Sequence, residues 1–139
     1  MSSQQPAEPA AAPPRKPLKI LVVDDEAHMR ALMKTLLSRA DPEYHIFEAY
    51  DGRQALEVAR RELPDLILLD IVIPLVSGVS VCEQLKRDPA TRNVKIILVT
   101  AKGREQMIYA GMEVGADDYI TKPFEREDFL ARVRQVLSG

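Results

Sequence analysis

Three short runs of apolar residues stand out along the chain: "KILVV" at 19–23, "DLILL" at 65–69 and "KIILV" at 95–99. The runs are rich in aliphatic residues and do not alternate with polar ones. Such unbroken runs are typical of parallel β-strands that are covered on both faces. Two less apolar segments, 44–49 and 117–120, predict weaker strands, and we expect at least one of them at a sheet edge.

Helical patterns separate these strands. The first predicted helix places five apolar residues on one buried face: Met29, Leu32, Met33, Leu36 and Leu37. A second helix at 51–63 opens with Asp51 and Gln54 at the spacing of a capping box. Further helices are predicted at 78–87, 104–114 and 125–137. Strands that alternate with helices in this way predict an α/β fold with a doubly wound parallel sheet.

The first 17 residues, "MSSQQPAEPAAAPPRKP", differ in composition from the rest of the chain. After Met1 they contain no aliphatic residue larger than alanine. Such a segment buries too little apolar surface to offset the entropy lost on ordering. We therefore expect a disordered Pro/Ala-rich tail at 1–17 and a single domain at 18–138.

Composition excludes several classes of protein. Hydrophobic residues make up 46% of the 139 residues, charged residues make up 29%, and the net charge is −2, so no basic stripe for nucleic acid is expected. A lone cysteine, Cys82, excludes an internal disulfide framework and fits a reducing compartment. No apolar run is long enough to span a membrane, and the N-terminus lacks the apolar core of a secretory signal. We expect a soluble cytoplasmic protein that binds neither nucleic acid directly nor a membrane.

Polar side chains gather where the predicted strands end. These strand ends carry three carboxylates, a hydroxyl and an ammonium group: Asp24, Asp25, Asp70, Thr100 and Lys122. In open α/β sheets the carboxyl ends of the strands line the crevice where ligands bind. Because parallel strands end at the same edge, we expect these five side chains to converge.

Three carboxylates in one place repel one another, and without a cation at least one would stay protonated near neutral pH. A hard divalent ion removes this conflict, and an all-oxygen site with few protein ligands suits Mg²⁺. Together with Lys122, such an ion would attract a phosphoryl group. A carboxylate can attack phosphorus to give an acyl phosphate. Asp70, which is central and follows an unbroken apolar run, is the candidate nucleophile.

Four motifs occur in order along the chain: "VVDDE" at 22–26, "LLDIVIP" at 68–74, "LVTA" at 98–101 and "DDYITKPF" at 117–124. With these motifs, residues 18–138 resemble the receiver domain of two-component response regulators, in particular the chemotaxis-regulator type. The resemblance implies a flavodoxin-like three-layer sandwich with strand order 2-1-3-4-5. It also implies a phosphorelay switch that takes a phosphoryl group from a histidine kinase or a histidine phosphotransfer protein. Such a protein is not a conventional enzyme, because it catalyses only its own phosphorylation and slow dephosphorylation.

The resemblance assigns a role to each residue of the site. Asp70 would be the phosphoacceptor. Asp25 and Asp70 would bind Mg²⁺ directly, together with the backbone carbonyl of Val72, and Asp24 would act mostly through water. Lys122 would pair with the phosphoryl oxygens.

The resemblance also implies a switch and an output surface. The hydroxyl of Thr100 would turn toward the phosphoryl group, and Tyr119 would move into the vacated space, although a ring simply packed against the sheet edge is an alternative. The Lys122–Pro123 peptide bond would be cis. Output would pass through residues 103–137 to an unknown partner protein, or to an output domain if this chain is the receiver of a longer regulator.

The chain departs from the family pattern in places. Ser77-Gly78 stands where many receivers have Asp-Gly, and we expect little effect on phosphoryl transfer because this turn lies outside the chemistry. Val72 and Lys102 occupy family positions that tune hydrolysis of the acyl phosphate. A valine cannot orient a water molecule, so we expect a longer-lived phosphorylated form.

Two other functions remain as alternatives. Phosphohydrolases with an aspartate nucleophile also use Mg²⁺ on a parallel sheet, but they typically need a second acid two residues after the nucleophile, where this chain has Val72, and an inserted cap region. A degenerate receiver would act only as a binding module, and retention of the full acidic set argues against it. We therefore expect a phosphorylation-controlled receiver.

Overall fold

The structure, a computed structural model, describes residues 17–139, so the tail expected at 1–17 lies outside the described residues except for Pro17. Five parallel strands form one sheet in the order β2-β1-β3-β4-β5. Their bounds are Lys19–Val23 for β1, His45–Ala49 for β2, Leu66–Leu69 for β3, Lys95–Ala101 for β4 and Asp118–Lys122 for β5. The α/β class and the strand order are confirmed, and both weaker strands, β2 and β5, lie at the sheet edges.

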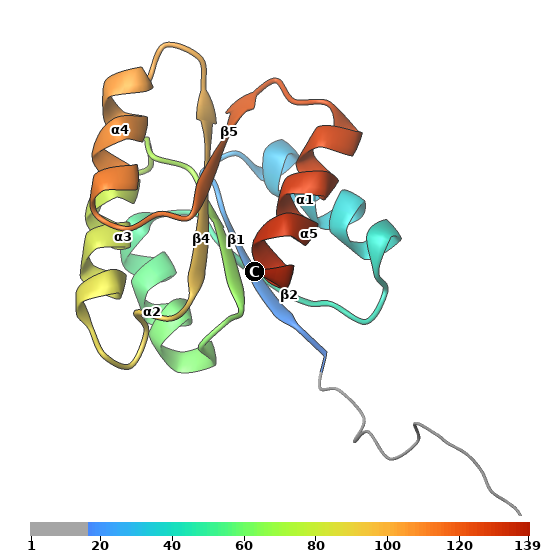
Figure 1. The fold of residues 1–139 in the computed structure, drawn as a ribbon, viewed down its shortest axis with the longest axis horizontal. Helices are drawn as coiled ribbons and strands as arrows, with labels where there is room; N and C mark the ends of the chain where they lie inside the picture. The colour runs from blue at the N-terminus through green and yellow to red at the C-terminus, as the bar shows by residue number, and fades with distance from the viewer. Residues whose placement is uncertain (1–16) are drawn as a thin grey trace, which may run out of the picture.

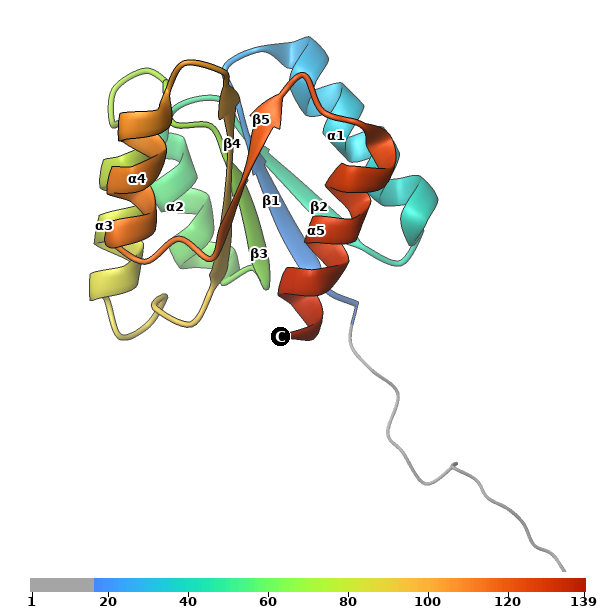
Figure 2. The same cartoon turned by 45° about the horizontal axis from the view of Figure 1, so that its top comes forward.

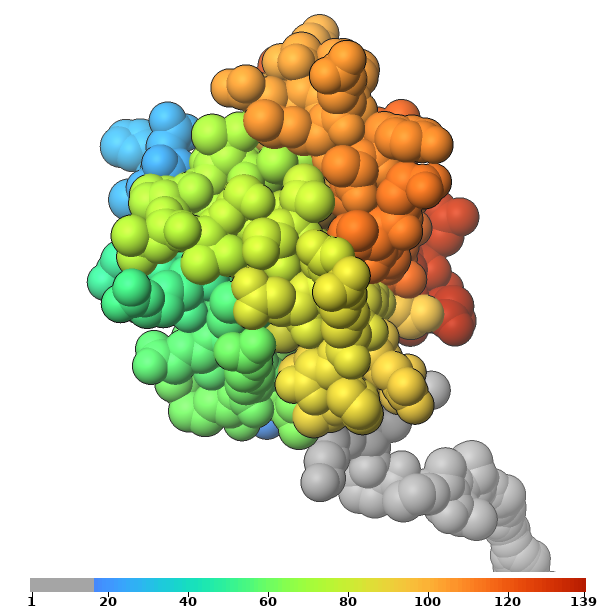
Figure 3. Space-filling model, turned by 90° about the vertical axis from the view of Figure 1, so that its left-hand side faces the viewer, coloured from blue at the N-terminus to red at the C-terminus, as the bar shows by residue number. Residues whose placement is uncertain are grey.

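The helices follow the strands in strict alternation and form two outer layers. Their bounds are Ala27–Ala40 for α1, Gly52–Glu62 for α2, Gly78–Arg87 for α3, Glu105–Glu113 for α4 and Arg126–Ser138 for α5. Helices α1 and α5 cover one face of the sheet, and α2, α3 and α4 cover the other (Figures 1 and 2). In Figure 3, side chains of α2, α3 and α4 close over the second face. None of the helices within 17–139 is long and apolar enough to cross a membrane.

Strand β3 shows why the apolar runs are unbroken. Successive side chains of a strand point to opposite faces of the sheet. Ile67 and Leu69 therefore pack into the core under α2 and α3, whereas Leu66 and Leu68 pack under α1 and α5. All four side chains are fully buried, so a polar residue at any of these positions would lie in a core.

Helix α1 differs from its predicted apolar face at one position. Met33, Leu36 and Leu37 are buried under α1 and Met29 is partly buried, but the side chain of Leu32 is 44% exposed. The face that meets the sheet is narrower than the predicted stripe, and Leu32 lies on its flank.

The N-terminus of α2 carries a variant of the predicted capping box. The Asp51 carboxylate accepts a hydrogen bond from the backbone N–H of Gln54 at 2.7 Å, as expected. The Gln54 side chain reaches back to the N–H of Tyr50 at 2.8 Å, one residue further than a capping box requires. The start of α2 is thus held from both sides of the cap.

Helix α3 begins against the end of β3. The N–H of Gly78 donates a hydrogen bond to the carbonyl of Ile71 at 2.8 Å. A β-carbon at position 78 would lie 2.6 Å from the Cα of Ile71 and would overlap the carbonyl oxygen of Asp70. Glycine therefore allows the helix to approach the backbone of Asp70 so closely.

Replacing Gly78 by Ala is expected to lower the free energy of unfolding by about 1–3 kcal/mol, because the new methyl group must displace the Asp70–Ile71 backbone. Urea denaturation followed by circular dichroism measures the change. Gln84→Ala, on the exposed face of the same helix, is the matched control and should stay within about 0.5 kcal/mol of the wild type. Equal stabilities for the two variants would contradict the close approach.

Candidate functional site

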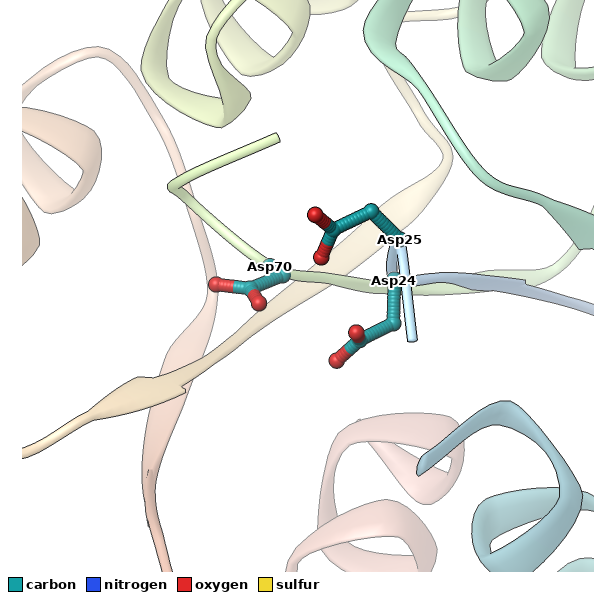
Figure 4. Close-up of side chains that lie close together, drawn as sticks. All are labelled: Asp24, Asp25 and Asp70. Carbon is teal, nitrogen blue, oxygen red and sulfur yellow. The ribbon is translucent and has the colours of Figure 1, made fainter. Parts of the chain in front are cut away.

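Three carboxylates meet at the carboxyl edge of the sheet. Asp24 and Asp25 directly follow β1, and Asp70 directly follows β3, the neighbour of β1 in the sheet. One oxygen atom from each carboxylate lies within 4.8 Å of the other two. Figure 4 shows the side chains reaching out from these adjacent strand ends. The strand order thus brings together carboxylates that are far apart in the sequence.

The backbone holds the site through hydrogen bonds that extend the sheet. The N–H of Asp24 donates to the carbonyl of Ala49 at 3.1 Å, and the N–H of Asp70 donates to the carbonyl of Val23 at 3.0 Å. Each bond lies one residue beyond the end of a strand. The positions of Asp24 and Asp70 are therefore set by the sheet and not by the loops that follow.

The two carboxylates after β1 have different environments. The Asp24 side chain is buried, and one of its oxygens accepts a hydrogen bond from the N–H of Glu26 at 2.9 Å. Asp25 is exposed, and within residues 17–139 no hydrogen bond or ion pair holds its carboxylate. Asp25 is thus the carboxylate that is free to meet a ligand from solvent.

Lys122 bridges the two buried carboxylates. Its Nζ atom lies 2.7 Å from Oδ2 of Asp24 and 3.0 Å from Oδ2 of Asp70. Burial acts to lower the pKa of Lys122, but the hydrogen bonds to Asp24 and Asp70 outweigh it and raise the pKa.

Lys122 is the last residue of β5, whereas the sequence predicted a strand ending at 120. Sequence reasoning assigned Lys122 to a phosphoryl group and missed this ion pair, which the shared sheet edge could have indicated.

Asp70 sits between a cation and a backbone donor. Besides the contact with Lys122, its Oδ1 accepts a hydrogen bond from the N–H of Val72 at 3.3 Å. Burial raises the pKa of Asp70 above the ordinary value, and the nearby charge of Asp24 adds to this, although Lys122 and Thr100 act in the opposite direction. The Asp70 carboxylate is therefore held in one orientation in a site that disfavours uncompensated negative charge.

The remaining candidate residues lie around this centre. Thr100 is buried in β4 and is close enough to Asp70 to influence its pKa. The side chain of Val72 is exposed, although its backbone contacts Asp70. The Lys122–Pro123 peptide bond is cis, as the resemblance implies.

Tyr119 lies apart from the carboxylates. Its ring is 42% exposed, and the guanidinium carbon of Arg132 lies 5.9 Å from the ring centroid. The structure thus places Tyr119 on the surface of β5, outside the cluster. Its inward movement stays a prediction.

The donor set fits a hard divalent cation. Carboxylate oxygens are preferred ligands of Mg²⁺, which is usually bound by one or two carboxylates and keeps several waters. Two of the three carboxylates are buried and one is exposed, so the cluster is open to solvent on the side of Asp25. Lys122 offers one positive charge to three carboxylates, which leaves negative charge for a cation to balance.

A family model for the response regulator receiver domain matches residues 20–134. Over 118 residues, 85% of this chain, the sequence is 47% identical to the phosphate regulon transcriptional regulatory protein PhoB of Pseudomonas aeruginosa, of which the match covers 51%. Over 120 residues, 85% of this chain, it is 45% identical to the response regulator PleD of Caulobacter vibrioides, of which the match covers 26%. The chain spans about half the length of PhoB and about a quarter of PleD.

Solved structures show the same fold. The receiver domain of a sensor histidine kinase from P. aeruginosa, crystallised with a magnesium ion coordinated in its active-site cleft, superimposes with a TM-score of 0.80 at 26% identity, over 88% of this chain and 99% of that one. The chemotaxis protein CheY4 of Vibrio cholerae superimposes with a TM-score of 0.78 at 28% identity, over 86% of this chain and 98% of that one.

Removing the positive charge of Lys122 should destabilise the fold. Lys122→Met leaves Asp24 and Asp70 buried without their partner, and we expect a loss of about 3 kcal/mol in the free energy of unfolding. Urea denaturation in the presence of a chelator measures this loss. The control is Lys34→Met, which removes a more exposed partner 2.7 Å from Glu48 and should cost less than about 1 kcal/mol. Equal losses of unfolding free energy in the two variants would show that the buried ion pair stabilises the fold no more than the exposed one.

Proposed function

The chain belongs to the family of response regulator receiver domains, and on this premise we propose that it accepts a phosphoryl group on Asp70 in a Mg²⁺-dependent reaction. The observation that carries the proposal is the fixed Asp70 carboxylate, with Lys122 on one oxygen and the N–H of Val72 on the other. We assign the receiver to residues 18–138, preceded by the tail at 1–17.

The environments of the three carboxylates favour Asp70 as the acceptor. Asp24 is engaged by Lys122 and by the N–H of Glu26 and is almost inaccessible, so a phosphorus atom could hardly approach it. Asp25 is accessible but is not held in a fixed orientation. Asp70 combines a fixed orientation with a place at the open cluster, which suits a nucleophile that must meet an incoming group in line.

In the proposed reaction an Asp70 oxygen forms a bond to phosphorus while the phosphorus–nitrogen bond of a donor phosphohistidine breaks. The electron pair of the broken bond stays on the departing imidazole. Asp24, Asp25 and Asp70, with the carbonyl of Val72, would hold Mg²⁺, which when bound supplies positive charge beside the phosphoryl oxygens. Lys122 would move its hydrogen bonds from the carboxylates to those oxygens.

The donor would be a histidine kinase or a histidine phosphotransfer protein, and we place this exchange in the cytoplasm. Tyr109, Met112 and Tyr119 expose apolar surface along α4 and β5, within the stretch 103–137 proposed for output. PhoB is a transcriptional regulatory protein, and the match covers 51% of its length. We propose that the receiver controls either a partner protein or an attached output domain through this surface.

The hydrolase alternative has less support. A second acid would be needed beside Asp70, and position 72 carries an exposed valine instead. The degenerate-receiver alternative conflicts with the complete set of carboxylates, lysine and threonine around Asp70. The degenerate receiver is one outcome of the labelling experiment below.

Incubation of the chain with acetyl phosphate and Mg²⁺ should add one phosphoryl group, detected by mass spectrometry of the intact protein. Asp70→Asn should abolish the addition, because an amide is not a competent nucleophile. Asp65→Asn, at the other end of the same strand and exposed, is the matched control and should be labelled like the wild type. Labelling that persists in Asp70→Asn would refute the assignment, and a wild type without labelling would favour the degenerate receiver.

The phosphorylated form should be long-lived because Val72 cannot orient a water molecule for attack. Val72→Asn should speed its decay by roughly a factor of ten, about 1.4 kcal/mol of barrier. The decay is followed by mass spectrometry after removal of acetyl phosphate. Leu75→Asn is the control in the same loop, because Leu75 is exposed and its φ of 73° suits asparagine. Decay of Val72→Asn at the wild-type rate would exclude this role.

A further inference from the structure

Arg30, in the first turn of α1, links three segments near the acidic cluster. Its Nη1 donates a hydrogen bond to the backbone carbonyl of Asp24 at 2.8 Å. Its Nε donates to Oε1 of Glu48 in β2 at 3.0 Å. Its guanidinium carbon lies 5.9 Å from the ring centroid of Tyr50, just after β2. One half-buried side chain thus ties the loop after β1 to the end of β2.

The carbonyl that Arg30 holds belongs to the peptide bond between Asp24 and Asp25. A peptide unit is planar, so a hydrogen bond that holds its carbonyl oxygen also restricts the orientation of the plane and the position of the next Cα atom. The Asp25 carboxylate has no hydrogen bond or ion pair of its own within the described residues. The place on the backbone from which this side chain starts therefore depends on the Asp24–Asp25 peptide, and through it on Arg30.

The other hydrogen bonds of this turn hold Asp24 and not the peptide carbonyl before Asp25: the N–H of Asp24 donates to the carbonyl of Ala49 at 3.1 Å. The cap residue of α1, Glu26, makes no side-chain capping hydrogen bond. The turn is held inside by the bond from the Glu26 N–H to Oδ1 of Asp24, at 2.9 Å. Arg30, which lies outside the turn, adds its hydrogen bond to the carbonyl of Asp24. We therefore expect the Asp24–Asp25 peptide to lose its fixed orientation without Arg30, while the sheet still holds the N–H of Asp24.

The charge of Arg30 is matched by Glu48 and not by the cluster. Glu48 also pairs with Lys34, whose Nζ lies 2.7 Å from Oε2. The carboxylates of Asp24 and Asp70 have their own cation, Lys122. Arg30 contacts the acidic loop through a backbone carbonyl and not through a carboxylate. This contact therefore orients the loop and does not neutralise its charge.

We propose that Arg30 is a positioning residue for the metal ligands: it holds the Asp24–Asp25 peptide so that Asp25 faces a divalent cation. The inference rests on the proposed Mg²⁺ site. It assigns Glu48 and Tyr50 a supporting part, because they fix the guanidinium from the β2 side.

For the variant Arg30→Ala, loss of positioning and loss of charge predict opposite changes in the affinity for a divalent metal ion. Removing a positive charge near a cation site reduces repulsion, so a charge effect alone would leave metal affinity unchanged or increase it. Loss of positioning would decrease it. Residues that orient metal ligands typically change affinity by about 10–100-fold when they are replaced.

The test measures binding of Mn²⁺ alone to the full chain, by calorimetry or by electron paramagnetic resonance, with no phosphodonor present. We expect Arg30→Ala to weaken binding about tenfold. Arg30→Lys keeps the charge but lacks the planar fork that serves the Asp24 carbonyl and Glu48 together, so it should recover only part of the affinity. Lys34→Ala removes the other cation on Glu48 without touching the acidic loop and should bind as the wild type does.

Binding by Arg30→Ala equal to or tighter than that of the wild type would overturn the inference. A lower melting temperature with unchanged Mn²⁺ affinity would likewise show a purely structural role. Should Arg30→Ala fail to fold, Glu48→Gln takes its place, with a smaller loss of affinity expected and an unchanged affinity overturning the inference. A wild type that binds no Mn²⁺ would instead refute the metal site of the proposed function, and with it this inference.

Discussion

The repulsion among three carboxylates at one sheet edge is the constraint on which the site depends. The parallel ladder fixes the backbone of Asp24 and Asp70, so these residues cannot separate to relieve it. Lys122 compensates for part of the charge by contacting both. An excess of negative charge remains, which suits a divalent cation. The proposed phosphoryl group would bring about −1.5 to −2 further charges, so Lys122 and Mg²⁺ would then both be needed to balance the site.

The fold makes this arrangement tolerable because the rest of each strand is buried on two faces. The side chains of β3 alternate between the two cores and hold the strand that ends at Asp70. Gly78 then lets α3 pack directly on the Asp70 backbone. The energy of burying apolar residues is thus available to hold polar groups that would otherwise separate.

Much of this could be predicted from the sequence, because the signals involved are local. Unbroken apolar runs predicted β1, β3 and β4, two less apolar segments predicted β2 and β5, and helical patterns predicted the helices. The shared edge of parallel strands predicted the meeting of Asp24, Asp25 and Asp70. The nearness of Lys122 to the carboxylates was expected from the same edge, but its direct pairing with two of them was not. The exposure of Leu32 and the reach of Arg30 to the Asp24 carbonyl were not predicted either. These features depend on side-chain directions between elements distant in sequence, and no periodicity encodes them.

The contacts of Tyr119 indicate how the proposed signal could reach the surface. Arg132 donates hydrogen bonds to the carbonyl of Tyr119 at 2.9 Å and to Asp118 at 3.0 Å, while its guanidinium also faces the Tyr119 ring. An inward turn of the ring would give up the cation–π contact with Arg132, about 0.5–1 kcal/mol at an exposed site, and would leave the backbone bond intact. A phosphoryl group shifts such an equilibrium only by its differential interaction with the two states. The hydrogen bond of Thr100 that the proposed switch would rearrange, about 0.5–1.5 kcal/mol, is of the same order as this cation–π term.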